Sequence, residues 1–267
     1  MIDSKIVIGS RGSTLALWQA RFVQSHLKDL GHNAIIKIIK TSGDVTKGPL
    51  SKVGGKGLFI KELEQELLRG EIDIAVHSLK DLPAKLPEPF QLIAYLPRHD
   101  PRDLIVFNTE QTELKIKTQE IKADFKSNAK LTIGTSSPRR AALIKKTFPN
   151  AILKDLRGNV DTRLSKLDQK EYDAIILAKA ALDRLELVDK YNCVPFSIEA
   201  MTPCGCQGII AIEALDSNQN IPKNIFDKIN CSKTREAAVF ERGILEAIEA
   251  SCTTPIGVYT DLSLIHI

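Results

Sequence analysis

Five arginines lie in turns that follow short apolar runs of this sequence, and segments with helical apolar spacing come after those turns. They are Arg11, Arg139, Arg140, Arg157 and Arg163. A cation at a helix N-terminus opposes the helix dipole unless a bound anion compensates it. Guanidinium groups bind carboxylates and phosphates through paired N–H donors. The pattern therefore predicts a ligand that carries several carboxylates or phosphates.

Further polar residues lie near these turns. Ser13 follows Arg11, and an ordinary helix N-cap is the favoured interpretation of this serine on its own. Lys56 stands in a glycine-rich run, residues 54–57, whose spacing differs from that of a Walker motif. Arg163 and Arg184 have a plain alternative as solvated or salt-bridged surface cations. The case for anion binding comes from the arginines as a group.

Asp81 follows the apolar run 72–76 within the segment His77-Ser78-Leu79-Lys80-Asp81. An aspartate held among cations stays ionised, and it can stabilise a developing positive charge or relay a proton. The alternative is an aspartate paired with Lys80 in an ordinary turn. His77 has no second His or Cys at metal-ligand spacing, so we expect a structural histidine and no metal site.

The five cysteines form an odd set without the spacing of a disulfide framework, so we expect free thiols. They are Cys193, Cys204, Cys206, Cys231 and Cys252. Cys252 stands in a loop that follows the amphipathic segment 234–250, where a thiol is more accessible to covalent chemistry than in a strand. On its own, an inert thiol is the simpler interpretation of this residue.

Alternating strands and helices position these residues. Strands are predicted at 5–9, 33–40 and 72–76, with amphipathic helices at 15–23 and 58–68 between them. The arrangement recurs, because residues 130–136 repeat the pattern of 5–11 and residues 171–176 echo 71–76. We therefore expect two α/β lobes with a ligand cleft between them at the carboxyl ends of the strands.

Composition and charge narrow the function classes. With 43% apolar and 26% charged residues, the chain of 267 residues is globular and long enough for two domains. The formal net charge of +4 is too mild to indicate nucleic-acid binding. No apolar run approaches a membrane span, and the N-terminus lacks the pattern of a signal peptide, so we expect a cytoplasmic protein.

Together the motifs resemble the porphobilinogen deaminase family, also called hydroxymethylbilane synthases, from residue 5 to about residue 261. The matching segments are Arg11-x-Ser13 with 15–19, the glycine-rich run 53–59, the segment 73–83, the turn 134–140, the segment 156–164 and Cys252-Thr253-Thr254-Pro255-Ile256-Gly257. Their order along the chain matches that of the family.

The resemblance implies a transferase that condenses four porphobilinogens head to tail with loss of ammonia, on a dipyrromethane cofactor bound by a thioether to Cys252. It implies that Asp81 is the catalytic residue. The cofactor-binding positions that it implies are Cys252, Lys80, Asp81, Ser137, Arg139, Arg140 and Arg163. The substrate-binding positions are Arg11, Ser13, Lys56, Phe59, Arg157, Arg163, Arg184 and Gln207. A monomer without nucleic-acid or membrane partners is expected.

The family fold implies two lobes of the periplasmic-binding-protein type and a small third α+β domain. Residues 1–97 with 197–216 are expected to form the first lobe, and 98–196 the second. Residues 219–267 would form a shortened third domain that carries Cys252. Two alternatives to an active enzyme are therefore kept. One is an inactive remnant of the family, and the other is a non-catalytic two-lobed anion-binding protein.

One departure from the family pattern lies within Pro203-Cys204-Gly205-Cys206-Gln207-Gly208, where Cys206 replaces the family's usual glycine. If the backbone at this position has a positive φ, Cys206 is strained.

Overall fold

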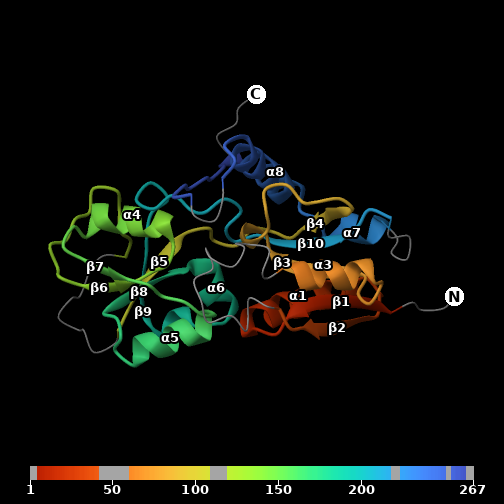
Figure 1. Ribbon diagram of the computed structural model, residues 1–267, viewed down its shortest axis with the longest axis horizontal. Helices are drawn as coiled ribbons and strands as arrows, with labels where there is room; N and C mark the ends of the chain where they lie inside the picture. The colour runs from red at the N-terminus through yellow and green to blue at the C-terminus, as the bar shows by residue number, and fades with distance from the viewer. Residues whose placement is uncertain (1–4, 42–59, 109–118, 218–222, 251–253, 263–267) are drawn as a thin grey trace. The chain divides into compact units, whose positions relative to one another are not determined.

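The computed structural model describes residues 5–41, 60–108, 119–217, 223–250 and 254–262 (Figure 1). These residues fall into two compact units. The first is drawn from Met1–Arg98, Ile209–Cys252 and Thr260–Ile267, and the second from His99–Gly208 and Thr253–Tyr259. Each unit is built on a sheet of five strands.

The first unit contains a mixed sheet with the order β2-β1-β3-β10-β4. Its strands are β1 (Ile6–Arg11), β2 (Ala34–Ile39), β3 (Ile74–Ser78), β4 (Phe90–Tyr95) and β10 (Ile210–Leu215). Strand β1 pairs in parallel with β2 and β3, whereas β10 runs antiparallel to β3 and β4. Strand β10 thus brings the chain back to the first sheet more than a hundred residues after β4.

Helices pack on this sheet. They are α1 (Thr14–Asp29), α3 (Lys61–Leu68), the short 3-10 helix η3 (Leu79–Asp81), α7 (Lys223–Ile229) and α8 (Ser232–Ala247). Helices α1 and α3 pack with the apolar faces that their sequences predict, whereas α8 buries Ala237, Ala238 and Glu241 and leaves Phe240 and Ile248 of its predicted apolar face exposed. Helix α1 buries Ala20, Val23 and Leu27 in one core with residues of α7. Helix α3 buries Leu63 and Leu67 in a separate cluster with Ile39 and Ala75.

The second unit repeats this pairing pattern in a sheet with the order β7-β6-β8-β5-β9. The strands are β5 (Asp103–Phe107), β6 (Thr132–Gly134), β7 (Ile152–Lys154), β8 (Ala174–Ala178) and β9 (Asn192–Pro195). The helices are α4 (Pro138–Thr147), α5 (Val160–Asp168), α6 (Lys179–Arg184) and the 3-10 helix η4 (Val188–Lys190). Strand β6 is parallel to β7 and β8, and β5 is antiparallel to β8 and β9.

The repeated sequence pattern, 71–76 and 171–176, corresponds to the same side-chain hydrogen bond in both units. Oδ2 of Asp73 accepts the backbone N–H of Val7 at 2.7 Å, and Oδ2 of Asp173 accepts that of Thr132 at 2.7 Å. Asp73 directly precedes β3 and thereby links it to β1, and Asp173 directly precedes β8 and links it to β6. The predicted α/β class with two lobes of related plan is confirmed.

Residues 197–208 belong to the second unit, although the sequence had placed them in the first lobe. The reason is a set of tertiary hydrogen bonds: Thr202 accepts from Arg139, and Gln207 donates to Pro101. Helices α7 and α8 group with the first unit, where the N–H of Cys231 donates to the carbonyl of Tyr95 at 2.7 Å. The separate third domain and the cleft between the lobes stay predictions.

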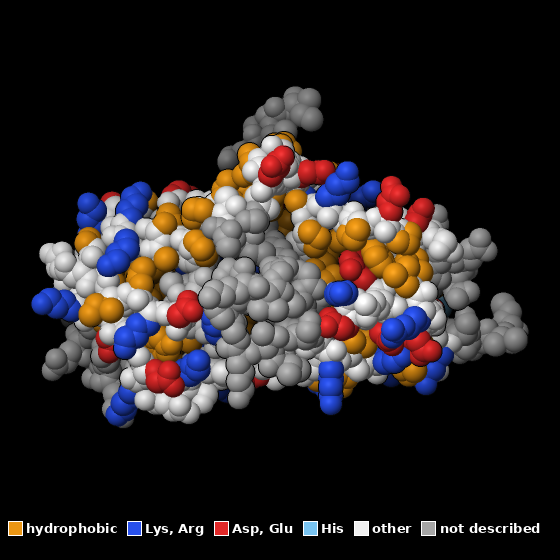
Figure 2. All heavy atoms as spheres, in the orientation of Figure 1, with side chains coloured by type: hydrophobic (Ala, Val, Ile, Leu, Met, Phe, Trp, Pro, Cys, Tyr) orange, Lys and Arg blue, Asp and Glu red, His pale blue; other side chains and the backbone are white. Residues whose placement is uncertain are grey.

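Charged side chains are interspersed on the face that Figure 2 shows, with Lys and Arg beside Asp and Glu rather than in one continuous basic patch. This distribution agrees with the mild net charge of +4. In the described part of the chain, no helix is long and apolar enough to cross a membrane.

Candidate functional site

Arg139 and Arg140 lie in the first turn of α4, at the carboxyl end of β6. Pro138 occupies the start of the helix, and the hydroxyl of Ser137 accepts the N–H of Arg140 at 3.4 Å as the N-cap. The exposed fractions of the two arginines are only 5% and 7%. Such burial of adjacent cations requires a partner, which the neighbouring turn residues do not supply.

Asp103, the first residue of β5, is that partner. Its Oδ2 accepts from Nη2 of Arg139 and its Oδ1 from Nη2 of Arg140, both at 2.7 Å. Nε2 of Gln207 donates to Oδ1 as well, at 3.0 Å. Burial alone would raise the pKa of Asp103, but the two guanidinium charges and these hydrogen bonds lower it to about 2. The carboxylate is therefore ionised throughout the physiological pH range.

The cluster of Asp103, Arg139, Arg140 and Gln207 keeps a net charge of +1, because one carboxylate faces two guanidinium groups. Nη1 of Arg139 donates to the carbonyl of Thr202 at 2.7 Å, and Nη1 of Arg140 donates to that of Ile176 at 2.9 Å. Nε of Arg140 is buried and has no hydrogen-bond acceptor among the described residues. A remaining charge and an unused donor are what a carboxylate ligand would need.

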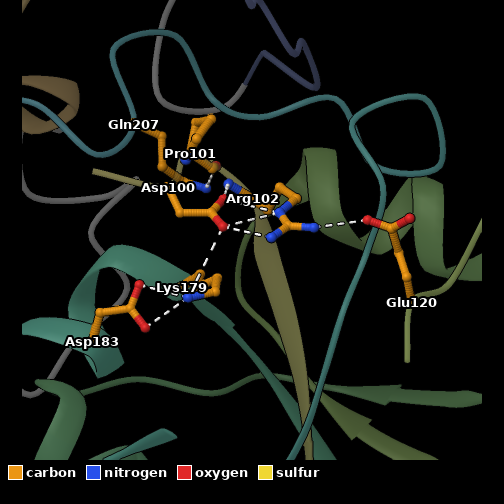
Figure 3. Close-up of polar contacts among 7 residues, drawn as sticks. All are labelled: Asp100, Pro101, Arg102, Glu120, Lys179, Asp183 and Gln207. Atoms are coloured by element: carbon orange, nitrogen blue, oxygen red, sulfur yellow. Dashed lines mark hydrogen bonds and ion pairs between the residues drawn. The ribbon is translucent and has the colours of Figure 1, made fainter. Parts of the chain in front are cut away.

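The segment before Asp103 is fixed by a separate polar network (Figure 3). Oδ2 of Asp100 accepts from Nη2 of Arg102 at 2.6 Å, and Nη1 of Arg102 donates to Glu120 at 2.7 Å. Lys179 pairs with Asp183 at 2.7 Å. Arg102 and Lys179 are thus engaged with other carboxylates, while Asp103 faces Arg139 and Arg140.

Arg139 is also linked to the segment that follows Cys252. The carbonyl of Thr202, which accepts from Arg139, lies against Gly257, where an added Cβ would approach its oxygen to 2.5 Å. The N–H of Val258 donates to the carbonyl of Pro203 at 2.9 Å. The glycine at position 257 is required by this close backbone approach rather than by its φ angle.

Arg157 and Arg163 lie beyond the carboxyl end of β7, at the start of α5. Nε of Arg157 donates to Asp155 at 3.1 Å, and Nε of Arg163 donates to the carbonyl of Gly158 at 2.8 Å. Asn159 caps the helix by accepting the N–H of Thr162. Neither arginine is fully buried, so both keep donors near solvent.

Arg184, at the end of α6, is only 5% exposed, which rules out the surface alternative. Its Nη2 donates to the carbonyl of Gly208 at 2.7 Å. Burial lowers the pKa of this guanidinium to about 10, although the nearby Asp183 acts in the opposite direction. The arginine remains charged at neutral pH, and its guanidinium lies beside Gly208.

In the first unit, Arg11 is the last residue of β1, and Asp81 follows the carboxyl end of the neighbouring strand β3. Ser13 is the N-cap of α1 and accepts from the N–H of Ala16 at 3.3 Å, as its favoured interpretation predicts. Lys80 and Asp81 lie in η3, which is tied to β10 where the N–H of Leu79 donates to Ile209 at 3.0 Å. The carboxylate of Asp81 is exposed and forms no ion pair with Lys80 or any other described residue.

His77 is buried, and its Nε2 lies 2.8 Å from Oε2 of the fully buried Glu213 on β10. This pairing fits the expected structural histidine. Three of the predicted site residues, Lys56, Phe59 and Cys252, lie outside the described residues.

Asp103 is the residue that sequence reasoning missed. It is the last residue of the polar, proline-containing run 98–103, whose composition is typical of a junction between elements. The available signal was the acid placed directly before the apolar run 104–107, because a charged residue at the edge of a buried strand requires a partner.

Cys206 has a φ of +63° and is buried, which confirms the predicted strain. We expect Cys206→Gly to raise the free energy of unfolding by about 1 kcal/mol relative to Cys206→Ala, because alanine keeps the Cβ that penalises this conformation. Chemical denaturation of the two variants measures the difference. Equal stability of the two would contradict the assignment of strain.

The chain matches the family model described as "Porphobilinogen deaminase, dipyromethane cofactor binding domain" over residues 6–223. A porphobilinogen deaminase of Francisella tularensis subsp. novicida (strain U112) is 43% identical over 261 residues, covering 97% of this chain and 82% of the relative. The protein of that name from F. tularensis subsp. tularensis (strain SCHU S4) shows the same identity and coverage. Among solved structures, a probable amino-acid ABC transporter extracellular-binding protein from Bacillus subtilis is similar to this chain at 12% sequence identity. The match covers 91% of this chain and 97% of that protein, with a TM-score of 0.47, and it carries no argument about function.

Proposed function

The chain belongs to the porphobilinogen deaminase family, and from this premise we propose how its own residues carry out the reaction. The protein is a transferase of tetrapyrrole biosynthesis, a hydroxymethylbilane synthase. It joins four porphobilinogens head to tail, releases one ammonia for each, and frees the linear product by hydrolysis. The observation that carries the assignment is the 43% identity to named porphobilinogen deaminases over 97% of the chain.

The residues of the second unit fit a dipyrromethane cofactor. Each pyrrole of this cofactor carries an acetate and a propionate. The net charge of the Asp103–Arg139–Arg140–Gln207 cluster and the unused Nε–H of Arg140 suit such carboxylates. When bound, the cofactor supplies the pyrrole carbon to which the incoming substrate is joined. We assign its carboxylates to Arg139, Arg140, Ser137, Arg163 and Lys80, and its covalent attachment to Cys252.

We assign Asp81 to the incoming substrate. Its carboxylate is exposed and carries no ion pair to a described residue, so it is available to a ligand. We assign it two tasks: holding the proton that the departing amine requires, and stabilising the cation that forms on the substrate as ammonia leaves. The pyrrole carbon that attacks this cation would lose its proton once the new carbon–carbon bond has formed, which balances the step.

The remaining assigned positions bind the carboxylates of substrate and growing product. They are Arg11, Ser13, Lys56, Phe59, Arg157, Arg163, Arg184 and Gln207. Among them, Arg157 and Arg163 keep donors near solvent, while Arg184 is held beside Gly208 by burial and one hydrogen bond. We further propose a cytoplasmic monomer that acts on this small molecule without nucleic-acid or membrane partners.

Incubating the purified protein with porphobilinogen tests the function directly. We expect ammonia release together with intact-mass increments of whole pyrrole units on the chain. Reversible binding without ammonia would indicate a two-lobed anion-binding protein instead. Neither binding nor release would indicate an inactive remnant.

A further inference from the structure

Asp103 touches three of the residues assigned above to cofactor or substrate binding, namely Arg139, Arg140 and Gln207. We propose that Asp103 is a positioning residue that sets the spacing of the two arginines, an inference that rests on the proposed function. It does not contact the reacting groups itself. Its role is to hold two neighbouring guanidinium groups in one fixed arrangement.

The geometry supports this role because each oxygen of the carboxylate takes a different guanidinium. Oδ2 binds Nη2 of Arg139 and Oδ1 binds Nη2 of Arg140, at the same distance of 2.7 Å. Two buried like charges on consecutive residues repel each other, and a carboxylate that bridges them offsets the repulsion and fixes their separation. Without the bridge, each guanidinium would keep, among the described residues, only a backbone carbonyl as its acceptor, from Thr202 or Ile176.

The surrounding polar network leaves Asp103 free for this task. Figure 3 shows Arg102 between Asp100 and Glu120, and Lys179 beside Asp183, so these cations are engaged elsewhere. Gln207 bridges the network to the cluster, because its Nε2 donates both to the carbonyl of Pro101 at 2.7 Å and to Asp103. Gln207 thereby ties the carboxylate of Asp103 to the backbone that precedes it.

The arrangement also connects the arginines to the segment after Cys252. Arg139 is held between Asp103 and the carbonyl of Thr202, and Thr202 lies against Gly257. The backbone at Thr202 and Gly257 therefore fixes the side of Arg139 that faces away from Asp103. Loss of Asp103 would loosen one side of this arrangement and leave the chain at Thr202 and Gly257 intact.

The first test compares Asp103→Asn with Asp173→Asn. Both substitutions replace a carboxylate of the second unit that accepts N–H groups, but Asp173 binds the backbone of Thr132 and is placed in none of the binding sites. We measure the cofactor-loaded fraction by intact mass and the turnover per loaded molecule. We expect turnover per loaded molecule to fall about 10- to 100-fold in Asp103→Asn and to stay at the wild-type value in Asp173→Asn.

A purely structural role would lower only the loaded fraction, so unchanged turnover per loaded molecule in a folded Asp103→Asn would overturn the proposal. If that variant fails to fold, Asp103→Glu keeps the charge and lengthens the side chain by one methylene. We expect it to fold and to lose turnover per loaded molecule as well. Wild-type turnover in Asp103→Glu would then overturn the proposal.

A second readout is independent of catalysis. Phenylglyoxal modifies accessible guanidinium groups, and peptide mass analysis of the unloaded protein locates the modified arginines. We expect Arg139 and Arg140 to be protected in the wild type and in Asp173→Asn, and to react in Asp103→Asn. Continued protection of both arginines in the folded Asp103→Asn protein would contradict the positioning role. A wild-type protein that neither acquires the cofactor nor turns over porphobilinogen would instead contradict the proposed function.

Discussion

Asp81→Ala will abolish turnover while the protein remains folded. The exposed carboxylate makes no ion pair with a described residue, so its removal costs little stability, within about 0.5 kcal/mol for a surface position. Catalysis loses both the proton-holding group and the charge that stabilises the substrate cation. General acid–base catalysis alone accounts for about 10²–10⁴-fold, so we expect at least a thousandfold fall in ammonia release.

A matched control is available in the second unit. Asp189 is also an exposed aspartate in a 3-10 helix, η4. Asp189→Ala should keep wild-type ammonia release and the same thermal transition as Asp81→Ala. A well-folded Asp81→Ala protein with substantial turnover would remove Asp81 from the catalytic role.

Cys252→Ser will remove the covalently held pyrroles and, with them, turnover. The thioether needs the sulfur of a reachable thiol, and serine cannot supply it under the same conditions. Intact mass should show the loss of the whole dipyrromethane increment, and an acid aldehyde stain for pyrroles should turn negative. Persistence of the increment on the Cys252→Ser chain would place the anchor elsewhere.

Cys193 provides the control for this experiment. Burial raises the pKa of its thiol to about 12, with a further contribution from Asp183, so the sulfur is protonated and unreactive at neutral pH. We therefore expect Cys193→Ser to keep the pyrrole increment. Loss of the increment in both variants would mean that the substitutions act through folding rather than through attachment.

Local patterns were sufficient for most of the repeating units. The apolar periodicity at 5–9, 33–40 and 72–76 corresponds to β1, β2 and β3, and the echo of 71–76 in 171–176 corresponds to β8 in the second unit. These elements follow from side-chain periodicity and short turns, which act within a few residues. The helix α6 was not identified because its six residues are too few for a helical periodicity, and the strands β4, β5 and β9 were not identified because their assignment depends on distant pairing partners.

The features of the candidate site also divide into those that the sequence predicted and those that required the structure. The sequence by itself determined the family, the strand-end location of the arginines and the place of Asp81 after β3, whereas the strain at Cys206 needed the positive φ that the structure shows. Only the tertiary structure decided that Arg184 is buried and that Asp103 bridges Arg139 and Arg140 across separations of 36 and 37 residues. A buried charge is stable only beside its partner, and chain folding, not local sequence, brings partners this far apart in the chain into contact.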